Sequence, residues 1–287
     1  MTEAERPAWQ PTRFVRFERS LKTSVRTAQI VTDAGKAYCK AMGNPEGPHA
    51  LACEWVGTQL ARWLGLPTFD CAILTLDDLD EIPFAGGGQA EPGPAFVARA
   101  EPGHTWGGTG LELQLVDNQE AIAKLVVFDT WTLNCDRYPP DLATRQPNYD
   151  NVFLSEEGAS PGRFRLVAMD HTHCFTCGRE LNERIASIDR TKDGQVYGLF
   201  PGFVAAVQVQ RPVVEAAAER LRTFTGAVGH DIVRTIPTDW QVSEPARAAL
   251  VDLLTQRAAF VADNIMRVLV PACWPQGELD FDSGGAS

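Results

Sequence analysis

Three stretches of the chain decide its fold class: Asn134-Cys-Asp-Arg137, Asp150-Asn-Val-Phe-Leu154 and Phe164-Arg-Leu-Val-Ala-Met-Asp-His171. The first follows a run of helical apolar spacing over residues 118–133. The second and third each join a short β-like apolar run to a polar residue. Together they predict a helix end followed by a two-stranded hairpin, with polar side chains gathered at one end of the hairpin.

Three of these polar residues are Asp136, Asn151 and Asp170. Transfer of a phosphoryl group from a nucleotide needs one carboxylate to orient the attacking hydroxyl, and an amide with a second carboxylate to hold Mg²⁺ on the phosphates. Asp136 suits the first role, and Asn151 with Asp170 suits the second. A helix end also favours Asn and Asp as capping residues, so Asn134 and Asp136 could serve only as caps.

The composition is that of a globular protein large enough for one large domain or two lobes, with 287 residues, of which 44% are hydrophobic and 22% charged. The net charge of −11, with scattered Lys and Arg, argues against a nucleic-acid-binding surface and disfavours an anionic membrane surface. No apolar run approaches the length of a membrane span, and the polar N-terminus does not resemble a signal peptide. The chain has seven cysteines, mostly within apolar runs, which predicts buried free thiols in a reducing cytoplasm.

The first third of the chain is rich in short β-like runs, and the remainder is mostly helical. A helix is expected from Pro48 to about Leu64, because proline suits a first helical turn and glycine at 65 suits a helix end. Residues 77–94, rich in Gly, Pro and acidic residues, are expected to form an exposed insertion. The other expected elements are strands over 14–17, 27–31, 37–40, 69–76 and 95–99, and helices over 118–133 with Asn118 as N-cap, over 213–224 and after Ser243.

This distribution predicts an α+β fold with two lobes. A β-rich N-terminal lobe would span residues 1–101, and a mostly helical C-terminal lobe would span 102–276. The polar and glycine-rich residues 277–287 are expected to be a disordered tail. A nucleotide would then lie in the cleft between the lobes.

Six motifs in a fixed order make the chain resemble the HipA-like kinase domain family, which is distantly similar to phosphatidylinositol kinases and protein kinases. The resemblance runs from about Arg16 to Ile265. It implies a two-lobed protein-kinase-like fold and an ATP-dependent Ser/Thr phosphotransferase. The motifs are Tyr38-Cys-Lys-Ala-Met-Gly-Asn-Pro-Glu-Gly47, Ala52-Cys-Glu54, Leu64-Gly-Leu-Pro67, Asn134-Cys-Asp-Arg137, Met169-Asp-His171 and Ile236-Pro-Thr-Asp-Trp240.

Carried over by position, the resemblance implies ATP and Mg²⁺ as cofactors and gives roles to residues of the first lobe. Lys40 would contact the α- and β-phosphates, and Glu54 would pair with Lys40. Asp170 would serve the nucleotide through its metal. On the residues alone, Lys40 could instead be an edge-strand lysine and Glu54 a surface acid, although the apolar neighbours of Glu54 favour a buried, paired carboxylate. Residues 100–103, with Glu101, would be the hinge that meets the adenine edge.

The chain departs from the family in its catalytic loop. Tyr138 stands where many relatives have His, and residues 139–149 look like an insertion between the base and the metal-binding amide. Asn151 is preferred as that amide because it directly precedes a β-like run. Asn148 remains an alternative.

The phosphate-covering loop is a further departure, because residues 20–26 contain no glycine. Backbone amides without glycine approach phosphate less freely. The side chains of Lys22, Ser24 or Arg26 would then bind the phosphates in their place.

His171, His173, Cys174 and Cys177 form a second cluster with zinc-like ligand types. Adjacent His and Cys are an awkward pair for one tetrahedral ion, and no second Cys-x-x-Cys accompanies them. An ordinary segment that follows the metal-binding aspartate is the preferred interpretation.

Three functions are consistent with the sequence. The first is a HipA-like Ser/Thr kinase that acts on a protein or peptide. The second is a small-molecule or lipid kinase with the same site, and the third is a catalytically weak nucleotide-binding pseudokinase. Substrate choice resides in loops, which the motifs do not specify.

Overall fold

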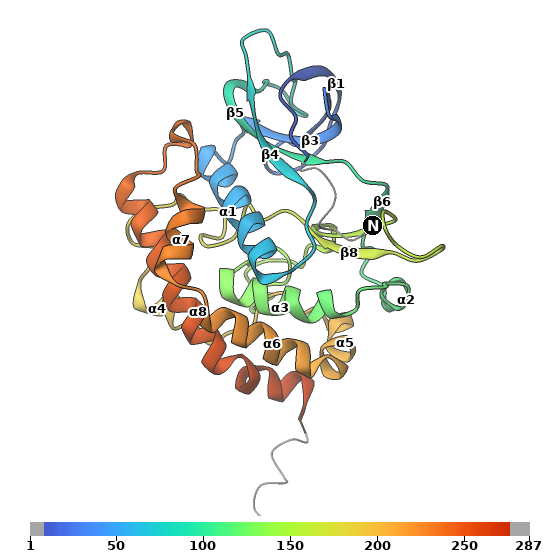
Figure 1. Cartoon of the computed structure of the whole chain (residues 1–287), viewed down its shortest axis with the longest axis vertical. Helices are drawn as coiled ribbons and strands as arrows, with labels where there is room; N and C mark the ends of the chain where they lie inside the picture. The colour runs from blue at the N-terminus through green and yellow to red at the C-terminus, as the bar shows by residue number, and fades with distance from the viewer. Residues whose placement is uncertain (1–8, 276–287) are drawn as a thin grey trace, which may run out of the picture.

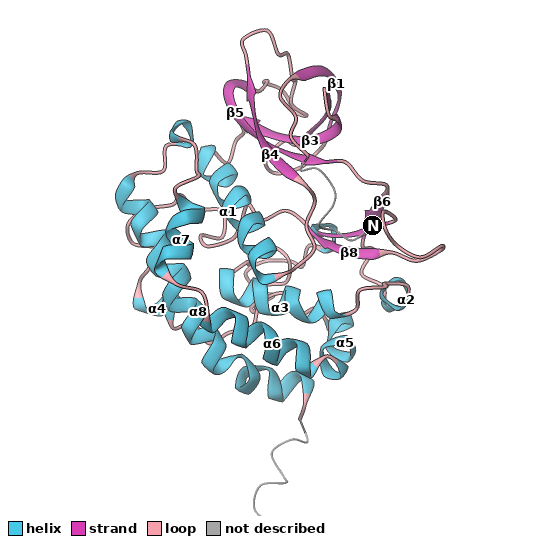
Figure 2. Ribbon diagram, viewed as in Figure 1, coloured by secondary structure: helices cyan, strands magenta, loops and turns pink. Residues whose placement is uncertain are grey.

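The structure is a computed structural model that describes residues 9–275 (Figures 1 and 2). The expectations for the extreme N-terminus and for the tail 277–287 lie outside the described residues. Strands gather in the upper part of the view and helices in the lower part, which confirms the α+β class. The helices and strands are β1 (Phe14–Ser20), β2 (Ala28–Thr32), β3 (Gly35–Met42), α1 (Pro48–Leu64), β4 (Cys71–Leu76), β5 (Glu91–Arg99), β6 (Gly103–Thr105), α2 (Gly110–Gln114), α3 (Glu120–Thr132), β7 (Val152–Ser155), β8 (Arg165–Ala168), α4 (Ile188–Thr191), α5 (Val204–Val209), α6 (Arg211–Arg222), α7 (Gly226–Val233) and α8 (Glu244–Cys273).

The N-terminal part is built on a five-stranded antiparallel sheet with the order β1-β2-β3-β5-β4. In β2, Ala28, Ile30 and Thr32 are buried and the residues between them are partly exposed, as the two-residue repeat of a strand requires. β3 and β5 are neighbours, and Lys40 of β3 lies opposite Phe96 of β5. The sheet therefore brings a cation and an aromatic ring to adjacent strands.

Helix α1 begins and ends where the sequence predicts. Pro48 lies in its first turn, and Gly65 ends it in the left-handed conformation with φ of 74°. On its inner side, a Cβ at Gly57 would lie 2.5 Å from Cβ of His171, so only glycine permits this close approach. The helix thereby holds Glu54 against the segment that follows β8.

The C-terminal part packs α3 against α6 and the long α8 (Figure 1). Ser243 caps α8 by accepting a hydrogen bond from the backbone N–H of Ala246. Beside these helices, β6, β7 and β8 form a three-stranded antiparallel sheet, and the β7–β8 pairing confirms the expected hairpin. The hairpin places Asn151 directly before β7 and Asp170 shortly after β8.

Two local expectations are wrong. β5 begins at Glu91, and Ile82 and Phe84 are buried in the apolar cluster of the sheet, so residues 77–94 are not a uniformly exposed insertion. Asn118 does not cap α3. Its side chain instead accepts from and donates to the backbone of Leu166, which ties the start of α3 to the hairpin.

No helix within the described residues 9–275 is both long and apolar enough to cross a membrane.

Candidate active site

A cleft of about 540 Å³ lies between the five-stranded sheet and the loops around the β7–β8 hairpin. This volume is within the range of small-molecule sites. Its walls near the hairpin are apolar and come from both lobes, with Phe96 and Ala98 from β5 and Phe153 from β7. Phe153 packs edge-on against Phe69, with ring centroids 5.1 Å apart. This part of the cleft suits a flat apolar group such as a nucleotide base.

A buried triad forms the inner end of the cleft. Lys40 Nζ lies 2.9 Å from Glu54 Oε2 and 2.9 Å from Asp170 Oδ1. Glu54 Oε2 also accepts the backbone N–H of His171 at 2.8 Å. Lys40 lies on β3, an inner strand of the sheet, and Lys40 and Glu54 are 8% and 3% exposed, so the alternative of an edge-strand lysine and a surface acid is wrong. The two carboxylates therefore hold the lysine at the inner end of the cleft.

The charge state of the triad follows from its pairing. Burial would lower the pKa of Lys40, but the charges of Asp170 and Glu54 outweigh burial and raise it. Burial would raise the pKa of Asp170, but Lys40 and a hydrogen bond from Thr172 hold it well below its usual value. Asp170 also has a positive φ of 56°, which is uncommon for a residue with a side chain. The site thus keeps an ionised carboxylate in a strained backbone position.

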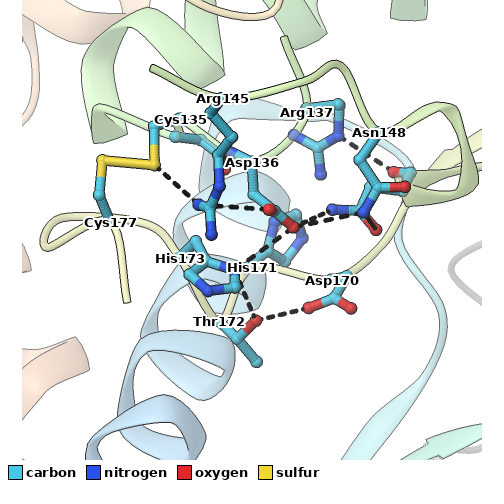
Figure 3. Close-up of polar contacts among 12 residues, drawn as sticks. Cys135, Asp136, Arg137, Arg145, Asn148, Asp170, His171, Thr172, His173 and Cys177 are labelled. Carbon is cyan, nitrogen blue, oxygen red and sulfur yellow. Dashed lines mark hydrogen bonds and ion pairs between the residues drawn. A yellow bond between two sulfur atoms is a disulfide. The ribbon is translucent and has the colours of Figure 1, made fainter. Parts of the chain in front are cut away.

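Asp136 lies across the cleft and is fully engaged by neighbours (Figure 3). Its Oδ2 accepts from Asn151 Nδ2 at 2.7 Å and lies 3.3 Å from His173 Nδ1. Asn148 Nδ2 also reaches Oδ2, at 3.4 Å, and Arg145 Nη1 lies 3.3 Å from Oδ1. Burial would raise the pKa of Asp136, but His173 and Arg145 outweigh it and lower the pKa. The carboxylate is therefore ionised at neutral pH, as a base or orienting group requires.

Both asparagines therefore reach the Asp136 carboxylate, and Asn148 Nδ2 also donates to Asn151 Oδ1 at 3.2 Å. Asn151 is 3% exposed and is the last residue of a short 3-10 helix, Tyr149–Asn151, that leads into β7. Asn148 lies in the loop before the hairpin. The choice of Asn151 as the metal-binding amide stays a prediction, since both side chains line the cleft.

The loop that carries Asp136 is fastened by a buried ion pair that sequence reasoning missed. Arg137 pairs with Asp129 of α3, and both side chains are fully buried. Arg137 also donates to the carbonyl oxygens of Asn151 at 3.0 Å and Met169 at 2.7 Å. The sequence did contain a signal for this ion pair: Asp129 lies within the apolar run of α3, and a buried carboxylate needs a partner. Arg137 thus joins the base, amide and carboxylate segments.

His173 and Glu46 are also parts of the site that the sequence did not reveal. His173 Nε2 lies 3.5 Å from Glu46 Oε2, while its other ring nitrogen faces Asp136. Burial would lower the pKa of His173, but these two carboxylates raise it to about 9. His173 therefore carries a positive charge beside the Asp136 carboxylate.

The four zinc-like residues do not converge on one point. His173 faces Asp136, whereas the buried ring of His171 packs edge-on against Phe128 with centroids 5.1 Å apart. Cys177 is joined to Cys135 by a disulfide. Within the described part of the chain, no group of three or more His, Cys, Asp or Glu is arranged to hold a metal ion.

The expectation of free thiols holds for five cysteines and is wrong for Cys135 and Cys177. These two are 42 positions apart, and their Cα atoms lie 5.7 Å apart. The catalytic loop and the loop after Asp170 meet only in the folded chain. Composition and local sequence could therefore not indicate the pairing.

The loop between β1 and β2 reaches the cleft through exposed side chains. Lys22, Thr23 and Ser24 line the cleft. Arg26 does not, and its guanidinium binds the carbonyl oxygen of Gly87 instead. Of the three side chains expected to replace glycine amides, the structure brings Lys22 and Ser24 to the site.

Glu101 is not brought to the cleft. Its carboxylate accepts from Ser155 Oγ at 2.6 Å and lies 3.2 Å from the guanidinium of Arg99. The hinge segment therefore uses this side chain to join β5 to β7. Contact with an adenine edge would be left to the backbone there.

The donor set fits Mg²⁺. Asp170 supplies a carboxylate and Asn151 an amide oxygen to the same cleft. Mg²⁺ prefers such oxygen ligands and is usually held by one or two protein groups together with phosphate oxygens. Asp170 and Asn151 would therefore supply two ligands, and the phosphate oxygens of a bound nucleotide would supply others.

Comparison with known proteins identifies the family, since the HipA-like kinase family matches residues 18–276. The chain belongs to the HipA-like kinase family. This HipA-like kinase is therefore a kinase-like phosphotransferase, and the resemblance stated from its motifs is confirmed. No curated protein matches its sequence.

Solved structures agree with the fold. The HipA-like kinase is similar to the crystal structure of the Helicobacter pylori proinflammatory kinase CtkA, with a TM-score of 0.57 and 13% identity over 91% of this chain and 99% of that chain. The Mycobacterium tuberculosis PknI kinase domain aligns over 86% of this chain and 98% of that chain at 10% identity, but its TM-score of 0.26 is too low to add to the argument. The likeness to CtkA confirms the two-lobed kinase fold.

Proposed function

We propose that this HipA-like kinase uses ATP and Mg²⁺ to phosphorylate a Ser or Thr hydroxyl on a protein or peptide. One observation carries the proposal: a single cleft has Lys40 paired with Glu54 and Asp170 at one end, and Asp136 in contact with Asn151 at the other. These are the charges and oxygen donors that phosphoryl transfer from a nucleotide needs.

Each group has one task in the proposed reaction. Lys40 holds the α- and β-phosphates, and Glu54 keeps Lys40 extended toward them. Asp170 and Asn151 would hold Mg²⁺, which would supply positive charge to neutralise the phosphates. Asp136 orients the acceptor hydroxyl and takes its proton as the acceptor oxygen attacks the γ-phosphorus. The bond from the γ-phosphorus to the bridging oxygen breaks, and ADP leaves with the electron pair.

A protein or peptide is proposed as the partner, because the net charge of −11 supports neither a nucleic-acid surface nor an anionic membrane. We also propose a cytoplasmic location, because five of the seven cysteines are free thiols and one pair, Cys135 and Cys177, is joined. Phosphorylation of a small molecule or lipid, or nucleotide binding without transfer, are outcomes that the test below separates.

The test is incubation of the purified protein with γ-labelled ATP, Mg²⁺ and a cell lysate. We expect the wild type to add labelled protein bands to those that the lysate alone produces, and Asp136→Ala, which serves as the control, to add none. Label that enters only small molecules or lipids on a chromatogram would replace the protein-kinase proposal with the small-molecule or lipid alternative. ATP binding without any transfer would indicate a pseudokinase.

A further inference from the structure

Arg145 reaches the catalytic base from the loop between Asp136 and the hairpin. Its Nη1 lies 3.3 Å from Asp136 Oδ1 and 3.1 Å from Cys135 Sγ (Figure 3). The side chain lines the cleft and is 34% exposed. A thiol or disulfide sulfur is a weak acceptor, so the carboxylate is the stronger of these two partners.

The other cations of the cleft are already committed or lie on the opposite wall. Lys40 is held by Glu54 and Asp170, and His173 lies between two carboxylates. Lys22 is on the exposed loop of the N-terminal sheet. Asn151 and His173 both contact Oδ2 of Asp136. Arg145 is the cation next to the other oxygen, Oδ1.

The position of Asp136 fixes where a transferred group must pass. The acceptor oxygen has to contact this carboxylate and, at the same moment, lie in line with the γ-phosphorus at about 3 Å. A guanidinium that touches Asp136 Oδ1 is therefore within reach of the γ-phosphoryl oxygens. A phosphoryl group also offers more negative charge than one carboxylate, and its oxygens match the planar fork of arginine.

We infer that Arg145 is a catalytic residue, an inference that rests on the function proposed above. When ATP binds, the guanidinium of Arg145 moves away from Asp136 Oδ1 and binds the γ-phosphoryl group. Its departure opens Oδ1 to the acceptor hydroxyl. The acceptor oxygen then bonds to the γ-phosphorus as the bond to the bridging oxygen breaks. The hydroxyl proton passes to Asp136, and ADP retains the electron pair. Arrival of the triphosphate thereby uncovers the base.

The test compares the dissociation constants of ATP and ADP, each with Mg²⁺, by titration calorimetry. Arg145→Ala should weaken ATP binding about tenfold to a hundredfold, the value of a charge-assisted hydrogen bond or two, and change ADP binding less than about twofold. Arg145→Lys, which retains the charge and loses the fork, should recover part of the ATP affinity. The matched control is Arg211→Ala, which removes an exposed arginine that pairs with Glu215 on α6. It should change neither constant.

The melting temperature of each variant without ligand shows that it is folded. Equal weakening of ATP and ADP in Arg145→Ala, or no weakening of either, would overturn the role of Arg145 while the wild type still binds ATP. If the wild type itself binds no ATP, the proposed function fails and the inference fails with it. The two failures are therefore distinguishable in one set of titrations.

Discussion

Replacement of Arg137 with methionine should destabilise the protein by about 3–5 kcal/mol, the cost of removing one member of a buried ion pair. Both Arg137 and Asp129 are fully buried, and Arg137 also donates to the carbonyl oxygens of Asn151 and Met169. Methionine fills similar space but leaves the Asp129 carboxylate with the hydrogen bond from Asn134 and without its counter-charge. A loss of this size lowers the melting temperature by roughly 6–20 °C in a domain of this length.

Urea denaturation followed by circular dichroism measures the loss. The matched control is Arg257→Met: Arg257 is equally buried, and its hydrogen bonds within the described chain go to backbone carbonyl oxygens. Adding Asp129→Asn to Arg137→Met should restore about half of the lost stability, because it removes the buried carboxylate charge that has no counter-charge. Adding Asp129→Asn to Arg257→Met should restore none. The reasoning fails if Asp129→Asn rescues both variants equally, or if Arg137→Met costs less than about 1 kcal/mol.

Three further predictions concern the site itself. Asp170→Ala should abolish both Mg²⁺-dependent ATP affinity and phosphoryl transfer, whereas Asp136→Ala should abolish transfer alone. Calorimetry measures ATP affinity and the labelled-ATP assay measures transfer. Equal loss of ATP binding in the two variants would mean that Asp136 is misassigned. His173 has a raised pKa of about 9, so its contribution to stability is complete below about pH 6.5 and is lost as pH rises through 9. The free energy of unfolding of the wild type should therefore fall by on the order of 3 kcal/mol between these pH values, and His173→Asn should remove that fall. An unchanged pH dependence in the variant would contradict the pairing of His173 with the two carboxylates. Reduction of the Cys135–Cys177 bond should cost about 2–4 kcal/mol in the wild type and nothing in Cys177→Ser, as thermal unfolding with and without reductant will show.

Local signals account for the parts of the fold that the sequence predicted. Pro48 and Gly65 mark the two ends of α1, and Ser243 marks the start of α8, because caps and breakers act within one or two turns. The β7–β8 hairpin followed from two β-like runs that are close in sequence. The motif order then indicated the kinase fold, since Asp136 and Asp170 bracket that hairpin.

The parts that were missed depend on contacts between distant segments. Cys135 and Cys177 meet because two loops pack together, and Ile82 is buried because its loop folds back over the sheet. The role of Asn118 was misjudged for the same reason, as its side chain serves the hairpin instead of its own helix. Arg145 was counted only as part of an insertion. No local pattern shows that an insertion returns to the site that it interrupts.

The Cys135–Cys177 bond has a consequence for the integrity of the chain. The segment that it closes into a ring contains Asp136, Asn151 and Asp170, so the proposed base and the two proposed metal ligands belong to one covalent loop. A protease that cuts the exposed residues 141–144 would leave two polypeptides still linked on either side of the cleft. On a denaturing gel, such a nicked kinase should migrate as one band without reductant and as two bands with reductant. The disulfide would keep Asp136 covalently linked to Asn151 and Asp170 after the backbone between them is cut.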